Sequence, residues 1–510
     1  MQNEGGNDEK MKWDIIICVV VFNVAAMLLA GWYTNRSNKK QNQTLDMATG
    51  GRSLGAFAVG STLCMTLLGS GNITGTYEGV YTTGLSVLWH SMGNGFALCL
   101  GAASIMIWAR RMRVTTTGEM LTKLYGKVLA VIVSAFNIVV GFAVACCEIQ
   151  ALGIAINAVT GMELRSAVIV ATILALMYIL IGGMKQGALL NQFFIVVLYI
   201  GVILVFIMVG KMLPDGSYNS IRDYYAANGK MEMLSITGGM QHFFTIALPL
   251  VMSNFFCHMS GQYLMQTACS AKSEKAIRHT VWWVGPVNCI VAATSAVVAL
   301  VANTMPAYEH LDAKTQTMAM LVGELPHWLV IVFLIAFTVG ILSTFASFVM
   351  SSATTITVDF VALYRPNMTG TEKNRYIRIG LVVSAAIIAI LAQFLPTVIV
   401  LFQWLFAQML PIIFFLIIGL FWKRNTGLAV ATMALTWIVT NVWTFTSLPA
   451  VLGMENINMI WIILAITLIM QIIGNLILPG RKGYFRSDDW FESEQFAIYE
   501  REKHGLSEVE

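Results

Sequence analysis

Charged residues are scarce in this chain. Asp, Glu, Lys and Arg make up 11% of its 510 residues, whereas soluble globular proteins carry roughly 25%. Hydrophobic residues make up 57%, and the formal net charge is only +4. This composition excludes a soluble domain and gives no indication of a nucleic-acid partner, so we expect a polytopic membrane protein.

The chain also lacks the residue patterns of metal centres and catalytic sites. Its eight cysteines lie in or at the ends of apolar segments, without a CxxC pair or a Cys/His spacing typical of zinc. No nucleophile elbow and no cluster of His, Asp and Glu is present. We therefore expect neither disulfides nor structural zinc, and we do not expect an enzyme.

Long apolar runs take up most of the sequence. A membrane-spanning helix needs about 20 predominantly apolar residues. Thirteen runs meet this requirement, at about 13–33, 54–81, 84–109, 128–158, 166–183, 190–211, 236–258, 280–303, 326–352, 379–396, 398–422, 427–446 and 458–479.

The distribution of Lys and Arg orients these runs. With the amino terminus outside, 24 of the 31 Lys and Arg residues fall on the inner side and seven on the outer side. Inner loops of membrane proteins are enriched in both residues, so we expect the amino terminus outside and the carboxyl terminus in the cytoplasm. This skew is typical of a multi-pass protein of a bacterial inner membrane.

The run at 54–81 contains a segment that is poorly suited to a helix. Residues 68–75 read LGSGNITG, with three glycines, two hydroxyl residues and one amide. Backbone that leaves the helix inside a bilayer must be satisfied by protein or by a watery cavity. Secondary transporters use broken helices of this kind to present carbonyl oxygens to a coupling cation.

Five motifs in a fixed order extend this interpretation. They are GGRSLG at 50–55, YTTGLS at 81–86 followed by Trp89, YILIGGMK at 178–185, QYLMQ at 262–266 followed by AKSEKAIR at 271–278, and LSTFAS at 342–347 followed by Ser351, Ser352 and Asp359. Together, over residues 46–365, they resemble the sodium/solute symporter family, which includes proline, pantothenate, sialic acid and sugar symporters.

The resemblance implies an all-α fold of the leucine-transporter type, a 5+5 inverted repeat with about thirteen transmembrane helices. The first helix of each repeat would be interrupted, near 69–71 and near 253–261. The implied parts are 1–53 (extracellular amino terminus, extra first helix and cytoplasmic loop), 54–211 (first repeat), 212–235 (extracellular loop), 236–422 (second repeat), 423–479 (two carboxyl-terminal helices) and 480–510 (cytoplasmic tail).

The resemblance also implies a sodium site between the first and the eighth core helix. Sodium needs several oxygen ligands in place of its water. The family's principal site, carried onto this sequence, takes the carbonyls of Met65, Leu68 and Gly340 and the hydroxyls of Ser343 and Thr344. In the competing interpretation these hydroxyls only bond carbonyls of their own helix.

One position departs from the family pattern. Where many members carry an aspartate after the Gly-Gly-x-Lys motif, this chain has Asn191. Some members use that carboxylate for a second sodium ion or for ion transit. Its loss favours one sodium ion per cycle and leaves a proton-coupled cycle open.

Glu148 is the most informative polar residue of the apolar run 128–158. A carboxylate in mid-membrane is costly and marks a functional site by default. It could pair with an amine on the solute, take up a proton, or bond a polar neighbour such as His90 or Gln150. The competing interpretation is an internally bonded glutamate that only orders the bundle.

Other candidates for solute binding lie on helices expected around the same cavity. Ser70, Gly71 and Asn72 expose the broken helix, whose amino-terminal end favours an anionic group. A solute carboxylate there and an amine near Glu148 would describe an amino acid or a betaine. The further candidates are His90, Asn254, His258, Gln262, Tyr263 (which resembles the family's inner-gate aromatic) and Gln403.

The many Phe and Met residues are expected in the core or facing lipid rather than in a cation cage. We therefore predict a sodium-coupled importer of a small polar organic solute (amino-acid-like, carboxylate or amine) that works by alternating access. Its expected partners are the solute and the lipid bilayer, and no obligatory protein partner is indicated. The alternatives are a proton-coupled or facilitative carrier of the same fold and, ranked below these, a membrane sensor or channel.

Overall fold

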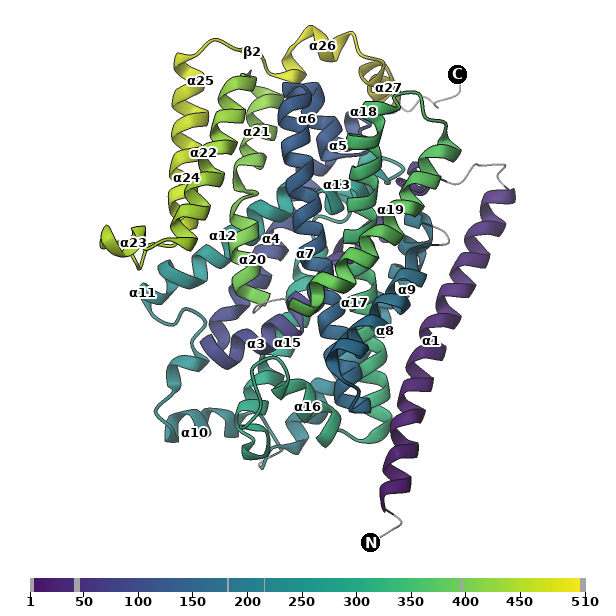
Figure 1. Ribbon diagram of the computed structural model, residues 1–510, viewed down its shortest axis with the longest axis vertical. Coiled ribbons are helices and arrows are strands. Elements are labelled where there is room, and N and C mark those ends of the chain that lie inside the picture. Colours follow the sequence, from purple (N-terminus) through teal and green to yellow (C-terminus); the bar gives the residue numbers. More distant parts are fainter. Residues whose placement is uncertain (1–3, 41–45, 181–182, 215, 395–397, 505–510) are drawn as a thin grey trace.

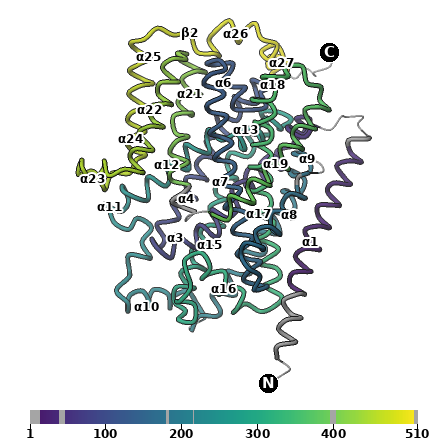
Figure 2. The backbone as a smooth tube through the Cα atoms, in the orientation of Figure 1, coloured from purple at the N-terminus to yellow at the C-terminus, as the bar shows by residue number. Residues whose placement is uncertain are grey.

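The computed structural model describes residues 4–40, 46–180, 183–214, 216–394 and 398–504. Long helices run side by side along the long axis of the molecule (Figures 1 and 2). Two short strands, β1 (Lys423–Arg424) and β2 (Arg481–Lys482), form an antiparallel pair. The helices are α1 Glu4–Lys40, α2 Ala56–Thr66, α3 Thr74–Thr83, α4 Leu88–Ala103, α5 Ile105–Arg111, α6 Thr117–Tyr125, α7 Lys127–Thr160, α8 Leu164–Leu180, α9 Gly183–Met212, α10 Asn219–Ala227, α11 Met240–His242, α12 Leu248–Ser260, α13 Gln262–Cys269, α14 Glu274–Arg278, α15 Val284–Asn303, α16 Gln316–Glu324, α17 His327–Thr355, α18 Ala362–Tyr364, α19 Gly370–Leu391, α20 Val398–Ala407, α21 Leu410–Phe421, α22 Thr426–Phe445, α23 Leu448–Val451, α24 Met459–Leu468, α25 Gly474–Ile477, α26 Asp488–Phe491 and α27 Glu494–Lys503.

Many of these helices are suited to a bilayer. Among the described residues, 11 helical segments are long and apolar enough to cross a membrane, and two shorter apolar helices cover Ala56–Thr66 and Leu164–Tyr178. One of the 11 segments, Ser70–Arg111, is interrupted at Gly84, where the chain passes from α3 towards α4. The count of thirteen spans therefore stays a prediction.

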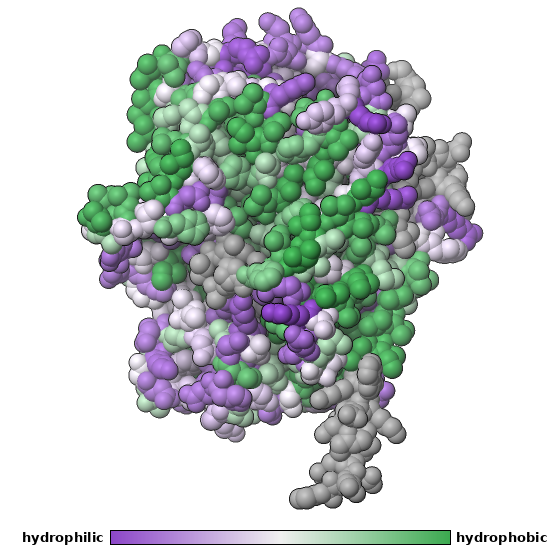
Figure 3. Space-filling view, viewed as in Figure 1, coloured by the Kyte–Doolittle hydropathy of each residue, from purple (hydrophilic) through white to green (hydrophobic). Residues whose placement is uncertain are grey.

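The outer surface carries an apolar band. Figure 3 shows hydrophobic residues over the middle of the molecule and hydrophilic residues at its two ends. Large aliphatic side chains such as Ile17, Leu28 and Leu29 on α1 are exposed. A bilayer requires this arrangement because its interior offers polar groups no water.

Two core helices are broken, as predicted. The first stops at Thr66, passes through a 3₁₀ turn at Ser70–Asn72 and resumes at Thr74. The second breaks at Gly261, whose backbone is extended (φ −69°, ψ 131°) between α12 and α13. The broken segments leave backbone groups without intrahelical partners at mid-bundle.

Helix α17 runs through the centre of the bundle and packs against α2, α7 and α9. Its sequence is apolar around most of the helix, which is typical of a helix buried on all sides. The small residues Gly340 and Ser343 let neighbouring backbones approach closely. This packing brings the middle of α17 against the break between α2 and α3.

The predicted extracellular loop at 212–235 and the connection at 304–325 contain helices. They hold α10 and α16, which lie at the same end of the bundle in Figure 1. The carboxyl-terminal tail lies across the opposite end, where Glu502 reaches Arg110 at 3.5 Å and Asp489 reaches Arg424 at 2.7 Å. Arginines assigned to the inner side by the charge distribution thus contact the tail.

Asp46 organises the entry to α2. Its Oδ1 accepts from the backbone nitrogens of Ala48 (3.0 Å) and Thr49 (3.1 Å), and its Oδ2 accepts from the Thr49 hydroxyl and from the Gly51 nitrogen (3.3 Å). Burial by itself raises the pKa of Asp46, but these hydrogen bonds outweigh it and hold the pKa below its ordinary value. The charged turn fixes the start of the first core helix.

The turn from α3 to α4 requires a glycine at position 84. Its φ of +63° and ψ of −149° lie in a region that only glycine adopts readily, and a Cβ atom there would lie 2.2 Å from the Met233 carbonyl oxygen. We predict that Gly84→Ala destabilises the protein by roughly 2 kcal/mol or more. Gly229→Ala is the matched control, because Gly229 also has a positive φ (+64°) but open space around it.

Thermal unfolding of the detergent-solubilised variants, followed by fluorescence-detected size exclusion, measures the difference. The control should lose about 1 kcal/mol. Equal losses in both variants would contradict the role of the Met233 contact.

Candidate functional site

The break in the first core helix faces the middle of α17. The Thr344 hydroxyl donates to the Met65 carbonyl at 3.0 Å and lies 3.1 Å from the Gly340 carbonyl of its own helix. A Cβ atom on Gly340 would lie 2.7 Å from the Leu68 carbonyl oxygen. The structure thus brings three carbonyl oxygens and one hydroxyl of the predicted sodium site together.

Ser343, the remaining predicted ligand, is held by α9. Its hydroxyl donates to Oδ1 of Asn191 at 2.6 Å, and the Tyr178 hydroxyl donates to the same oxygen at 3.1 Å. Because the Ser343 proton points to Asn191, the lone pairs of its oxygen stay available to a cation. Asn191 therefore lies beside the ion-site candidates, where it offers a neutral amide in place of a carboxylate.

Glu148, on α7, binds the broken helix directly. Its Oε1 and Oε2 accept from the Ser70 backbone nitrogen at 3.0 and 2.8 Å, and Oε1 also accepts from the Ser70 hydroxyl at 2.7 Å. A Cβ atom at Gly69 would lie 2.4 Å from Glu148 Oε2 and 2.5 Å from Thr344 Oγ1. The Glu148 carboxyl and the Thr344 hydroxyl therefore both lie against Gly69. A side chain at this position would collide with both groups.

This geometry changes two sequence-based interpretations. The neighbours considered for Glu148 were His90 and Gln150, but its hydrogen-bond partner is Ser70, while Gln150 donates to the Ala392 carbonyl at 3.4 Å. The anion at the amino-terminal end of the break was expected to come from a solute. In the structure the protein itself supplies an acidic group there, the Glu148 carboxyl.

Asn72 turns away from the cavity. Its amide nitrogen donates to Asn288 on α15 at 2.9 Å, and its amide oxygen accepts from Ser91 at 2.7 Å and from Asn94 at 3.2 Å, both on α4. Asn72 thus ties the break to two neighbouring helices. Its placement fits a positioning role rather than solute contact.

His90 and Asn254 form a buried pair between α4 and α12. The Asn254 amide nitrogen donates to Nδ1 of His90 at 2.9 Å and to the Leu250 carbonyl at 2.9 Å. An amide nitrogen only donates, so Nδ1 accepts and the ring proton lies on Nε2. Nε2 lies near Gly71, so His90 presents an N–H group towards the broken helix.

His258 and Tyr263 form the corresponding pair at the second break. The Tyr263 hydroxyl bonds Nδ1 of His258, and the Tyr263 ring lies against Phe348 of α17, with ring centroids 4.0 Å apart. The His258 ring also packs edge-on against Phe406, with centroids 5.4 Å apart. Both broken helices and α17 therefore meet at one buried centre.

A small cavity of about 30 Å³ lies at this centre. It is lined by Thr66, Leu67, Gly69, Gly71, His90, Asn94, Val144, Glu148, His258, Thr344, Phe348, Phe402 and Phe406. The predicted residues Gly71, His90, Glu148, His258 and Thr344 are thus brought together. The cavity holds little more than one water molecule, so the helices around it must move apart to admit an organic solute.

Six predicted solute contacts lie outside this lining: Ser70, Asn72, Asn254, Gln262, Tyr263 and Gln403. Gln262 is bound to α6, because its Oε1 accepts from the Thr117 nitrogen at 2.6 Å and its Nε2 donates to the Thr115 carbonyl at 3.1 Å. Gln403 is absent from the lining, although Phe402 and Phe406 of the same helix contribute. The structure therefore places an aromatic face of α20 at the cavity.

Sequence reasoning missed the aromatic lining. Phe348 follows Thr344 by four residues, so it shares the ion-site face of α17. Phe402 and Phe406 have the same spacing on α20 and stack with centroids 4.8 Å apart. This spacing was the available signal, but phenylalanines at such spacing also fill ordinary cores.

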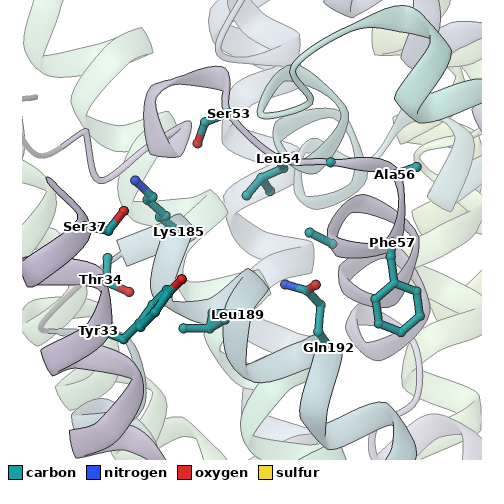
Figure 4. Close-up of a pocket in the computed structure, with 12 residues that line it drawn as sticks. Tyr33, Thr34, Ser37, Ser53, Leu54, Ala56, Phe57, Lys185, Leu189 and Gln192 are labelled. Atoms are coloured by element: carbon teal, nitrogen blue, oxygen red, sulfur yellow. The ribbon is translucent and has the colours of Figure 1, made fainter. Parts of the chain in front are cut away.

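A larger cavity of about 440 Å³ lies away from this centre, between α1 and the starts of α2 and α9. Figure 4 shows Lys185 near Ser37 and Ser53 on one side of it and Phe57 on the other. It shares no lining residue with the central cavity. We place the functional site at the smaller cavity because the ion-site oxygens and Glu148 are there.

Comparisons with known proteins agree with this geometry. A model of the sodium:solute symporter family matches residues 48–436. The chain is 24% identical over 369 residues to the high affinity choline transporter 1 of Mus musculus, which covers 69% of this chain and 61% of that protein. It is 26% identical over 189 residues to the sodium/iodide cotransporter of Homo sapiens, which covers 37% of this chain and 29% of that protein. The chain thus spans less than two thirds of the length of either relative.

Among solved structures, a Na⁺-coupled sialic acid symporter in a substrate-bound outward-open state is similar over 92% of this chain and 99% of that chain, with a TM-score of 0.73 and 17% identity. This likeness confirms the leucine-transporter type of fold. The family model covers most of the sequence, and its members are transporters and not enzymes. The chain therefore belongs to the sodium:solute symporter family.

Proposed function

We propose that the protein couples the entry of sodium to the import of a small polar organic solute. One observation carries this proposal: the Thr344 hydroxyl lies 3.0 Å from the Met65 carbonyl, across the break of the first core helix, beside a cavity lined by Glu148. Hydroxyl and carbonyl oxygens are hard ligands suited to an alkali cation. Membership of the family supports sodium as the coupling ion.

The ion would be held by Met65, Leu68, Gly340, Ser343 and Thr344. The carbonyls of Met65 and Leu68 lie at the carboxyl-terminal end of a half-helix, where the helix dipole favours a cation. The Ser343 oxygen is oriented by Asn191. A bound ion would replace the hydrogen bond from Thr344 to Met65 and join α2 to α17.

Alternating access would follow from this joining. Sodium would fix the first core helix against α17 in a form open to the outside, and the solute would then bind at the cavity beside it. Closure of the outer side and movement of Tyr263 would release both ligands into the cytoplasm. An inward potential of 100 mV contributes roughly 2.3 kcal/mol for each charge moved.

A proton-coupled carrier of the same fold is the second candidate function. It is favoured by Glu148, a buried carboxylate at the cavity, and by the amide of Asn191 beside Ser343. In that mechanism a proton on Glu148 would replace sodium as the coupling ion. The two mechanisms differ in the gradient that drives uptake.

Loss of a single hydroxyl tests the ion site. We predict that Ser343→Ala and Thr344→Ala each raise the sodium concentration for half-maximal uptake roughly tenfold or more, because one ligand worth about 1–3 kcal/mol is removed. Ser351→Ala is the control, since its hydroxyl bonds the Phe348 carbonyl of its own helix at 2.8 Å. Unchanged sodium dependence in both site variants, at normal membrane levels, would refute the assignment.

Gradient-driven uptake separates the two mechanisms. In proteoliposomes we expect solute accumulation with an inward sodium gradient and none with a proton gradient alone. Because Asn191 gives the site no carboxylate for a second ion, the Hill coefficient for sodium should be close to 1. Accumulation driven by protons in sodium-free buffer would favour the second candidate, and a Hill coefficient near 2 would contradict the single-ion cycle.

A further inference from the structure

Glu148 is a buried acidic residue without a positively charged side chain in an ion pair with it, among the described residues. Its carboxylate oxygens accept three contacts from Ser70 and donate none. The Ser70 nitrogen can only donate, and hydrogen bonds donated to a carboxyl group favour its ionised form. Among the described residues, no Lys, Arg or His forms an ion pair with it, and its side chain is almost fully buried.

A buried, unpaired charge in a membrane protein is strongly unfavourable, so a cation from outside is expected to approach it in the working cycle. Sodium at the five predicted ligands would bring one positive charge close to Glu148. The carboxylate, however, also lines the cavity that the aromatic residues line. It is therefore open to a second ligand there.

The same carboxylate blocks an anionic solute. The Ser70 backbone nitrogen, which begins the 3₁₀ turn between α2 and α3, already donates to Glu148 at 2.8 and 3.0 Å. A solute carboxylate would have to displace Glu148 from this donor or lie next to a like charge. Both cost free energy, so the centre disfavours carboxylates and zwitterions that would use this helix end.

The rest of the lining suits a positively charged organic group. Phe348, Phe402 and Phe406 line the same cavity as Glu148, and Phe402 lies close to Gly71 of the broken helix. Phe402 stacks with Phe406 and, at 6.3 Å between centroids, with the His90 ring. Aromatic faces attract cations, and their apolar surface matches alkyl groups rather than a hydrated metal ion.

We propose that the transported solute is a small organic cation whose ammonium group lies between Glu148 and the rings of Phe348, Phe402 and Phe406. This assignment rests on the proposed sodium-coupled import, because the solute and the ion would occupy adjacent positions around Thr344. It makes Glu148 the residue that selects the charge of the solute. Sodium would be held by the carbonyl and hydroxyl ligands in the absence of the solute.

The test is a thermal-shift titration of the full chain in detergent, with potassium replacing sodium in the reference buffer. The cationic probes are methylammonium, tetramethylammonium and choline. The matched neutral probe is 3,3-dimethylbutan-1-ol, in which carbon replaces the charged nitrogen of choline, and the anionic probe is 3,3-dimethylbutanoate. We expect sodium to stabilise the protein, and at least one cationic probe to add stabilisation that neither matched probe gives.

Variants then assign the charge to Glu148. Glu148→Gln should weaken the binding of the cationic probe at least tenfold, and it should weaken the binding of sodium less than this, because sodium keeps its five proposed oxygen ligands. Glu148→Asp, which keeps the charge, should retain part of the affinity. Glu78→Gln, at another buried glutamate that is absent from the cavity lining, should bind the cation like the unmodified protein.

The outcomes separate this inference from the proposed function. If sodium gives no stabilisation of the unmodified protein, the sodium-coupled function itself fails. If sodium stabilises but no cationic probe does, or if the neutral or anionic probe stabilises equally well, the inference is overturned. It is also overturned if Glu148→Gln binds the cation normally, or if that variant loses the sodium response while it keeps the cation response. Should Glu148→Gln not fold, the matched probes on the unmodified protein and on Glu148→Asp still decide.

Discussion

Backbone that leaves a helix inside a bilayer must find new partners, and this constraint shapes the centre of the protein. Between Thr66 and Thr74 the first core helix gives up its regular hydrogen bonds. The freed donor at Ser70 goes to Glu148, and the freed acceptor at Met65 goes to Thr344. One break therefore requires an anion on one side and a hydroxyl or cation on the other.

The two sides of the break differ in their chemistry. The carboxyl-terminal end of the outgoing half-helix exposes carbonyls, which suit sodium, while the amino-terminal end of the next half exposes N–H groups, which suit an anion. Because α7 supplies Glu148 at that second end, the centre carries a carboxyl group next to the proposed ion site. The coupling of ion and solute that we propose follows from this adjacency, since a single glycine, Gly69, separates the carboxylate from Thr344.

The surrounding polar pairs hold this arrangement in place. Asn191 orients Ser343, Asn254 orients His90, and Asn72 links the break to α4 and α15. Each of these amides is buried and hydrogen-bonded to a residue on another helix. In the low dielectric of the bundle such bonds are strong and specific in direction, so they fix the oxygens and the ring nitrogen at the cavity.

The sequence by itself determined the membrane class, the apolar runs and the break at 68–75, because hydrophobic length and glycine content act locally. Its ordered motifs also indicated the family, and they indicated the residues Met65, Leu68, Gly340, Ser343 and Thr344 of the sodium site that we propose. The sequence could not show that Gln262 contacts α6, that Asn72 bonds other helices instead of lining the cavity, or that Phe402 lines it in place of Gln403. These features depend on the rotation of each helix about its axis, which is set by the neighbouring helices. Only the tertiary structure decided that Glu148 meets Ser70, since residues 78 positions apart along the chain are brought together by the packing of α7 against the broken helix.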